Sequence, residues 1–171
     1  SGVFNYAVKD AGKISAYGAE ASLKLAIFRG LQLFGNYAYI HSRFAEKDTG
    51  GEEQDYADNM PGLTPEHSFA AGLQFRAGIA PGLFLFAVPS YSYKTKMFFD
   101  DANTAGFEQA AYGVLNFRGG IELADPKLTL VVYGTNLLDE QYIISAGNTG
   151  SLFGAPTLIP GAPGMAGAKL T

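Results

Sequence analysis

Residues 15–43 read SAYGAEASLKLAIFRGLQLFGNYAYIHSR, and this stretch decides the fold. From Tyr17 to Ile27 every second residue is apolar, whereas the residues between them include Glu20 and other polar side chains. This period of two is typical of a β-strand with one apolar face and one polar face. Residues 31–43 alternate in the same way, so the stretch predicts a hairpin of two long strands.

The connection between the two runs fixes how they pair. Residues 28–30 predict a three-residue loop, with Gly30 supplying the left-handed backbone conformation that such a loop needs. This loop places Ile27 opposite Leu31. The apolar faces then coincide, because a slip of one residue would invert one of the strands.

Both strands are much longer than the roughly five to six residues of an average globular strand. A strand that crosses a bilayer at a tilt needs about 9–11 residues, and both runs exceed that length. The length and the single apolar face favour a transmembrane β-barrel. A large soluble sandwich or lipocalin-like barrel also alternates, and this hairpin alone leaves that alternative open.

The composition limits the possible classes of protein. Charged residues make up only 16% of the chain, below the usual value of about 25%, which suits long, half-apolar strands. No apolar run approaches the roughly 18 residues of a transmembrane helix. Cysteine is absent, which excludes disulfides and thiol chemistry. The net charge of −4 argues against a nucleic-acid partner.

The same alternation recurs along the chain and predicts eight strands. They cover residues 2–9, 15–27, 31–43, 63–77, 83–97, 110–123, 128–138 and 164–171. Pro89 cannot donate a ladder hydrogen bond, so we expect a bulge or a local break there. Phe84 and Phe86 fall on the polar face, which predicts that this part of the face packs against something.

The connections between the predicted strands differ in length at the two ends. Those at 28–30, 78–82 and 124–127 are short, whereas those at 45–62, 99–108 and 144–163 are long. Short turns at one end and long loops at the other are typical of outer-membrane barrels, whose long loops are extracellular. Two tyrosine pairs, 37/39 and 91/93, then lie toward the long-loop end, as an aromatic girdle would. The pattern therefore favours the membrane barrel over the soluble alternative.

The polar face carries the candidate functional residues. We expect these side chains to line the lumen and to contact water or a plug. They are Glu20, Lys24, Asn36, Arg76, Lys94, Arg118 and Glu122. The alternative for each is that it pairs with a neighbour across the strands and has no role in binding a ligand.

No enzyme chemistry is indicated. His67 follows Glu66 directly, and adjacent strand residues point to opposite faces, so the two do not form a catalytic pair within the strand. His41 is interpreted as an ordinary polar residue near a strand end. The acidic stretch at 45–62 matches no metal-binding loop pattern and is interpreted as a solvated loop rather than a cation site. We expect no catalytic residue, no metal site and no cofactor.

Several stretches, in order, resemble the C-terminal end of a TonB-dependent outer-membrane receptor. The most specific is NLLDEQY at 136–142, which is similar to the family's N-L-F-D-x-x-Y. Residues 15–23 are similar to its S-x-x-G-x-E-x-x-L strand, and Pro163-Gly164 to its closing P-G-x-P-R segment. Further matches lie at 30–39, 64–67 and 91–100.

The resemblance implies a fold and a domain organisation. It implies an all-β, antiparallel transmembrane β-barrel segment of about eight long strands, the last third of a barrel of about 22 strands. Residues 1–171 would then be the C-terminal part of the barrel domain, without the plug domain, the TonB box or the N-terminal strands. The chain begins Ser-Gly-Val-Phe with no signal peptide, so we expect the front of the protein to precede it. The family's last strand usually ends in an aromatic residue, whereas this chain ends at Thr171.

The resemblance also implies a function. Such receptors take up a scarce nutrient (an iron–siderophore, a cobalamin or an oligosaccharide) across the bacterial outer membrane. The implied partners are outer-membrane lipid, the rest of the barrel, the plug domain, TonB acting through the plug, and the small-molecule nutrient. The alternative is a small stand-alone outer-membrane barrel that acts as an adhesin or a pore. The sequence does not identify the ligand.

Overall fold

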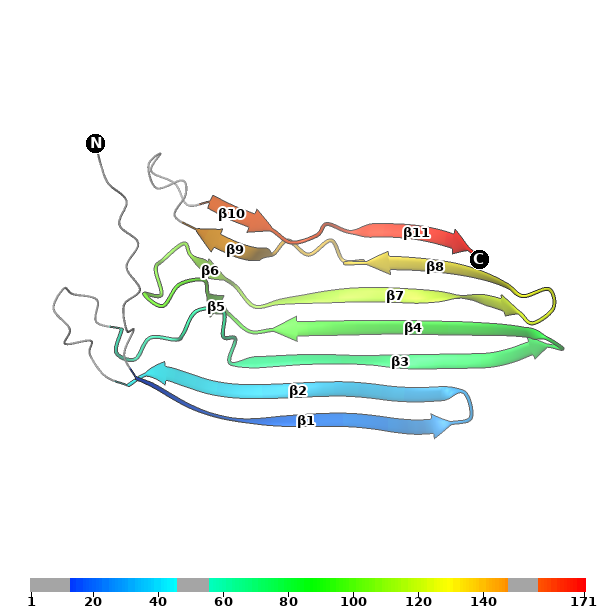
Figure 1. Ribbon diagram of the computed structural model, residues 1–171, viewed down its shortest axis with the longest axis horizontal. Helices are drawn as coiled ribbons and strands as arrows, with labels where there is room; N and C mark the ends of the chain where they lie inside the picture. The colour runs from blue at the N-terminus through cyan, green and yellow to red at the C-terminus, as the bar shows by residue number, and fades with distance from the viewer. Residues whose placement is uncertain (1–12, 46–55, 148–156) are drawn as a thin grey trace.

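A computed structural model describes residues 13–45, 56–147 and 157–171. Its main feature is an antiparallel sheet of seven strands in the order β1-β2-β3-β4-β7-β8-β11, shown in Figure 1. The strands are β1 (Ile14–Phe28), β2 (Leu31–Phe44), β3 (His67–Ala80), β4 (Leu83–Lys94), β7 (Tyr112–Leu123), β8 (Leu128–Thr135) and β11 (Met165–Leu170). These seven correspond to seven of the eight predicted strands. The predicted strand at 2–9 and most of the acidic stretch lie outside the described residues.

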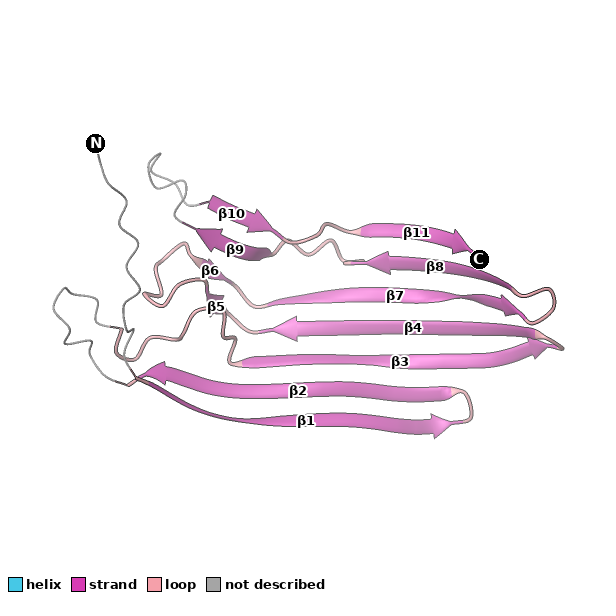
Figure 2. Cartoon of the chain, viewed as in Figure 1, coloured by secondary structure: helices cyan, strands magenta, loops and turns pink. Residues whose placement is uncertain are grey.

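Two short ribbons lie within the long connections. β5 (Met97–Phe98) pairs with β6 (Glu108–Gln109), and β9 (Ile143–Gly147) pairs with β10 (Thr157–Pro160). Figure 2 shows both ribbons at the long-loop end of the sheet. The sequence did not predict them, because runs of two to five residues are too short to display an alternation.

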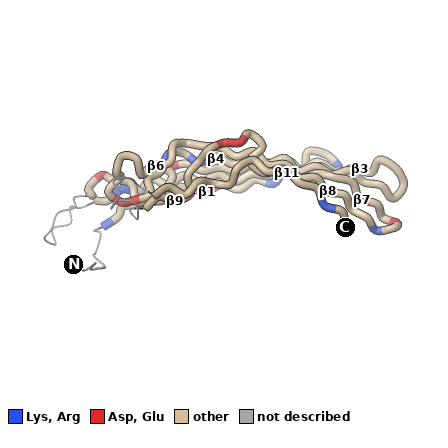
Figure 3. The backbone as a smooth tube through the Cα atoms, turned by 90° about the horizontal axis from the view of Figure 1, so that it is seen from above, with Lys and Arg blue, Asp and Glu red and all other residues tan. Residues whose placement is uncertain are grey.

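The sheet is a single layer. Seen from above in Figure 3, the described strands lie in one thin layer. Only four apolar side chains are buried in the described part of the chain: Phe44, Phe86, Met97 and Val131. By contrast, Leu23 and Leu25 are 53% and 50% exposed. The large apolar side chains therefore do not meet across a closed interior, as they would in a soluble sandwich.

Strand pairing keeps the apolar and polar residues on opposite faces. Leu33 lies opposite Leu25 on β1 and Leu73 on β3, whereas its neighbour Gln32 lies opposite Gln74. Apolar residues continue to lie opposite apolar residues across β4 and β7 to β8, where Ile121 lies opposite Leu130. We call the side that carries Leu33 the apolar face and the opposite side the polar face.

The predicted register of the first turn is wrong by one position. Phe28, not Ile27, lies opposite Leu31, and the ladder shifts between Ala26 and Phe28. A bulge at this point absorbs one residue, so the connection is a two-residue turn that ends on Gly30 with φ of 92°. Leu25 still faces Leu33, as the predicted pairing requires.

The second turn also differs from the prediction. A connection over residues 78–82 would place Ala77 opposite Leu83. Instead, β3 continues to Ala80, and Ala77 lies opposite Leu85. The slip is of two residues and leaves the faces unchanged, because side chains alternate with a period of two. No bulge forms at Pro89, since β4 keeps a constant register with β7 through this residue. The predicted local break is present on the other side of β4, because its pairing with β3 is interrupted between Gly72–Ser90 and Phe75–Ala87.

The residues that the structure describes contain no helix long and apolar enough to span a membrane.

Candidate functional site on the polar face

All seven residues predicted to line a lumen lie on the polar face. The register shows this pair by pair: Asn36 is opposite Ala70, for example, and Lys94 is opposite Tyr112. The seven are Glu20, Lys24, Asn36, Arg76, Lys94, Arg118 and Glu122. They are spread over the whole height of the sheet rather than gathered at one point.

The structure brings two of them together at the short-turn end. The Nε and Nη2 atoms of Arg76 on β3 both donate to Oε2 of Glu122 on β7, each at 3.0 Å. The two side chains reach toward each other across β4, and the guanidinium carbon lies 3.9 Å from the ring centroid of Phe84. The side chains are 51% and 36% exposed. An ion pair this exposed contributes little to the free energy of folding, but it holds the two charged groups in a defined position.

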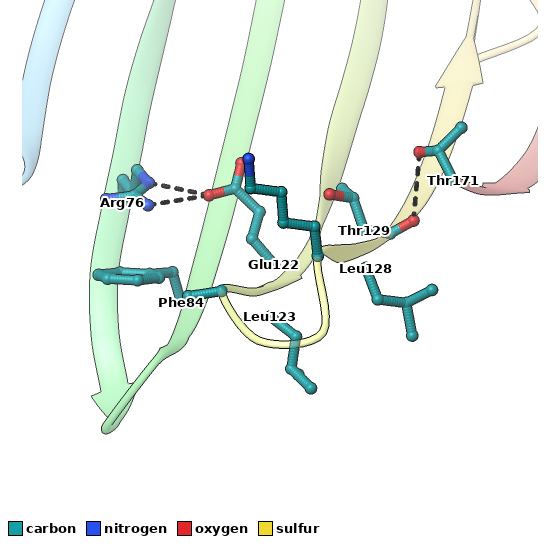
Figure 4. A pocket seen from close by; sticks show the side chains of 9 residues that line it. Arg76, Phe84, Glu122, Leu123, Leu128, Thr129 and Thr171 are labelled. Carbon is teal, nitrogen blue, oxygen red and sulfur yellow. Dashed lines mark hydrogen bonds and ion pairs between the residues drawn. The ribbon is translucent and has the colours of Figure 1, made fainter.

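This pair forms one side of a shallow pocket of about 410 Å³. Lys127, Thr129 and Thr171 also line it, as Figure 4 shows for the two threonines. The pocket lies beside the β7–β8 turn and is open. Its walls offer a carboxylate, two cationic groups and hydroxyls, which suits a charged polypeptide segment better than an apolar small molecule.

The aromatic residues on the polar face have specific partners. Phe86 lies under the guanidinium of Arg118, with 5.4 Å from its ring centroid to the guanidinium carbon. Gly120 lies opposite Phe86, and a Cβ there would meet the Phe86 ring and a backbone carbonyl. Gly78 likewise lies opposite Phe84. The predicted packing of these rings is thus partly against arginines and glycines of the same sheet.

A second cluster lies at the long-loop end. The rings of Tyr112 and Tyr142 stack with centroids 4.6 Å apart and an interplanar angle of 8°. Gln109 is buried, and its Oε1 accepts a hydrogen bond from the backbone N–H of Ile143. Tyr112 lies opposite Lys94. This stack, in a strand position next to Lys94, was not predicted, because it joins segments far apart in the sequence.

The structure shows what the first residue of the NLLDEQY stretch, Asn136, contributes to the fold. Asn136 is 2% exposed and has a positive φ of 50°. Its Nδ2 donates to the carbonyls of Glu140 at 2.9 Å and Ala162 at 3.0 Å, and its Oδ1 accepts from the Glu140 N–H at 2.9 Å. Asp139 Oδ1 accepts from the N–H of Gly164 at 2.9 Å. These bonds fix the start of β11 against the end of β8.

Two long connections are joined in a similar way. Asn103 accepts from the N–H of Met60 at 2.9 Å and donates to its carbonyl at 2.7 Å. Asp101 Oδ1 accepts from the N–H of Gly62 at 2.8 Å. The β2–β3 and β4–β7 connections therefore form one block where the structure describes them.

His41 lies near the end of β2, as predicted, and has a partner that the sequence did not predict. Its Nδ1 lies 2.7 Å from Oε1 of Glu66. The hydrogen bond with His41, together with the positive charge of Arg43, holds the pKa of the Glu66 carboxyl below its usual value. This pairing lies across strands, so the sequence carried no signal for it. No group of three metal-ligating side chains occurs among the described residues.

The comparisons with known proteins agree with this geometry. Residues 1–137 match the family model described as TonB dependent receptor-like, beta-barrel. The ferric yersiniabactin uptake receptor FyuA of Yersinia pestis is similar with a TM-score of 0.78 and 22% identity, over 94% of this chain and 23% of that chain. BauA, the ferric preacinetobactin receptor of Acinetobacter baumannii, gives a TM-score of 0.73 and 14% identity, over 94% of this chain and 22% of its own.

A third solved structure, the siderophore receptor PiuA of Acinetobacter baumannii, gives a TM-score of 0.70 at 18% identity, over 93% of this chain and 22% of that chain. At such identities the likeness shows the fold. The chain spans less than a quarter of the length of these structures. Because the family model covers most of the chain, the chain belongs to the TonB-dependent receptor β-barrel family, whose members are transporters of the bacterial outer membrane and not enzymes.

Proposed function

We propose that residues 1–171 form the C-terminal part of the barrel wall of a receptor that imports a ferric siderophore in a TonB-dependent manner. The observation that carries the proposal is the one-sided sheet. Leu23 and Leu25 are half exposed on the apolar face, whereas the charged side chains of the seven strands lie on the polar face, except for Arg43 near the long-loop end of β2. Hydrocarbon is the medium that makes such a face favourable.

The siderophore is proposed from the structural neighbours. The three solved structures compared above are named as receptors for ferric yersiniabactin, for ferric preacinetobactin and for a siderophore. A cobalamin or an oligosaccharide is the less favoured cargo, because no described structural feature points to either.

The two ends of the polar face would have different partners. The long loops would be extracellular, so the Tyr112–Tyr142 stack beside Lys94 is the part of this chain that would meet the nutrient. The short turns would be periplasmic, so the pocket beside Arg76 and Glu122 would contact the plug, through which TonB acts. Glu20, Lys24, Asn36 and Arg118 would line the lumen between these two levels.

The alternative of a small stand-alone barrel is less well supported. β1 and β11 end the strand order, and they do not pair with each other in the described part of the sheet. Seven strands with two open edges need further strands for closure.

The test is uptake of radioactive iron by cells that carry the complete receptor as their sole siderophore importer. We expect accumulation from a panel of ferric siderophores that is lost when TonB is deleted. Replacing Tyr112 with alanine should raise the half-saturating concentration, whereas the matched replacement of the outward-facing Tyr91 should not. Ion conductance without TonB-dependent uptake would contradict the proposal and favour the pore.

A further inference from the structure

A continuous row of rings lies on the apolar face near the long-loop end. Tyr37 donates or accepts a hydrogen bond with His67 at 2.7 Å, and the His67 ring stacks on Tyr39 with centroids 4.9 Å apart. Tyr39 meets Tyr17 edge-on at 6.4 Å, and Tyr17 lies 5.0 Å from the His41 ring. We call these five residues the Tyr–His patch. Both histidines of the chain belong to it.

The hydrogen bonds inside the patch orient both imidazoles. Nδ1 of His67 is engaged by Tyr37, and Nδ1 of His41 is engaged by Glu66. Nε2 is therefore the ring nitrogen that each histidine offers to a group outside the protein. Histidines ordered in this way, on a face otherwise made for hydrocarbon, need a polar counterpart at the membrane surface.

Two permanent cations lie next to the patch. Arg43 follows His41 on the same face of β2, opposite Ser15. Lys13 is exposed and lies opposite Ala45. The N–H of Ala45 donates to the carbonyl of Lys13 at 2.7 Å. Glu66 is near Arg43, and its carboxylate is already bonded to His41. Arg43 Nη1 donates to the carbonyl of Ser42 at 2.8 Å, which leaves its other N–H groups for an anion.

An apolar groove of about 240 Å³ begins at the other side of the patch. Its floor is made of small residues in neighbouring strands, because Gly35 lies opposite both Leu23 and Ala71. Leu23, Tyr37 and Phe69 form its walls. Tyr37 therefore belongs to both the groove and the patch, so the two are continuous.

We propose that the groove and the patch together bind one phosphorylated, acylated lipid of the outer leaflet. An acyl chain lies in the groove over Gly35, and the phosphate lies at Arg43, Lys13 and the Nε2 atoms of His41 and His67. Along the strands the order is apolar groove, aromatic rings, then cations, which is the order of hydrocarbon, interface and headgroup in a membrane. A protein partner would not need this order. The inference rests on the proposed outer-membrane placement.

The test uses the complete receptor in mild detergent, with bound lipid counted by native mass spectrometry. The probes are lipid A that carries both phosphates and the same lipid after its phosphates are removed. Arg43→Gln should lower the affinity for the phosphorylated probe about fivefold and leave that for the dephosphorylated probe unchanged. The matched control Arg29→Gln, in the short turn at the opposite end of the same hairpin, should change neither.

A second variant tests the groove independently of charge. Ala71→Phe should lower the retention of both probes, whereas Ala87→Phe, on the same face of β4, should not. Each variant is first shown to be folded by the mobility shift of unheated samples in gels. Equal phosphate preference in Arg43→Gln and Arg29→Gln, or equal retention by the two phenylalanine variants, overturns the proposal.

Iron uptake, measured in parallel, separates this inference from the proposed function. A receptor that imports iron but binds both probes equally refutes the lipid site alone. A receptor that prefers the phosphorylated probe but imports nothing keeps the lipid site and refutes the proposed transport.

Discussion

The two ends of the sheet are held in different ways. At the short-turn end, backbone groups connect neighbouring turns: Arg76 N–H donates to the carbonyl of Gly30 at 2.7 Å, and Ala124 N–H to that of Gly82 at 2.8 Å. At the long-loop end, side-chain amides and carboxylates add to such backbone bonds, most completely at the buried Asn136. In the described part of the sheet, the long connections therefore depend on specific side chains more than the short turns do.

Loss of the amide at the long-loop end should have the largest effect. Asn136→Ala removes the three hydrogen bonds that this buried side chain makes to backbone groups of Glu140 and Ala162, and it places alanine at a positive φ. We expect the free energy of unfolding to fall by roughly 3–5 kcal/mol. Urea unfolding of the complete receptor in lipid vesicles, followed by far-UV circular dichroism, measures it.

The control for this prediction is Asn36→Ala, because Asn36 is an exposed asparagine on the polar face. It should change the free energy of unfolding by less than about 0.5 kcal/mol. If the two variants were equally stable, the Asn136 bonds would not hold the long-loop end, and the contrast between the ends would be lost.

The ion pair at the short-turn end should matter much less for stability. Arg76 and Glu122 are partly exposed, so a double-mutant cycle of Arg76→Gln and Glu122→Gln should give a coupling energy of about 1 kcal/mol or less. The same urea titration measures it. A coupling of several kcal/mol would mean that the pair is shielded from water and that this end, too, depends on its side chains.

The strands and their faces could be predicted because the alternation is local. Leu33 and Gln32 are adjacent residues of opposite character, and a run of such pairs is enough to predict which face each joins. The turn registers were less predictable, since the bulge at Ile27 depends on backbone conformation rather than on hydropathy. A slip of two at Ala77 changes no face, so the pattern of apolar residues does not report it.

The candidate sites were only partly predictable. The alternation was enough to predict that Arg76 and Glu122 share the polar face. Their contact across β4 was not predictable, because it depends on the relative stagger of three strands. The pairing of His41 with Glu66 joins two connected strands through a long loop, and no local pattern encodes it. Contacts of this kind need coordinates, because the sequence fixes neither their distance nor their direction.

The central claim is that hydrocarbon covers the apolar face, and the adjacent residues Leu33 and Gln32 test it most directly. In lipid vesicles, Leu33→Arg should lower the free energy of unfolding of the complete receptor by about 2–4 kcal/mol if Leu33 lies near the bilayer midplane. Gln32→Arg, on the polar face, should cost much less. If the receptor tolerated arginine equally well at both positions, the apolar face would not contact lipid and the account would be wrong.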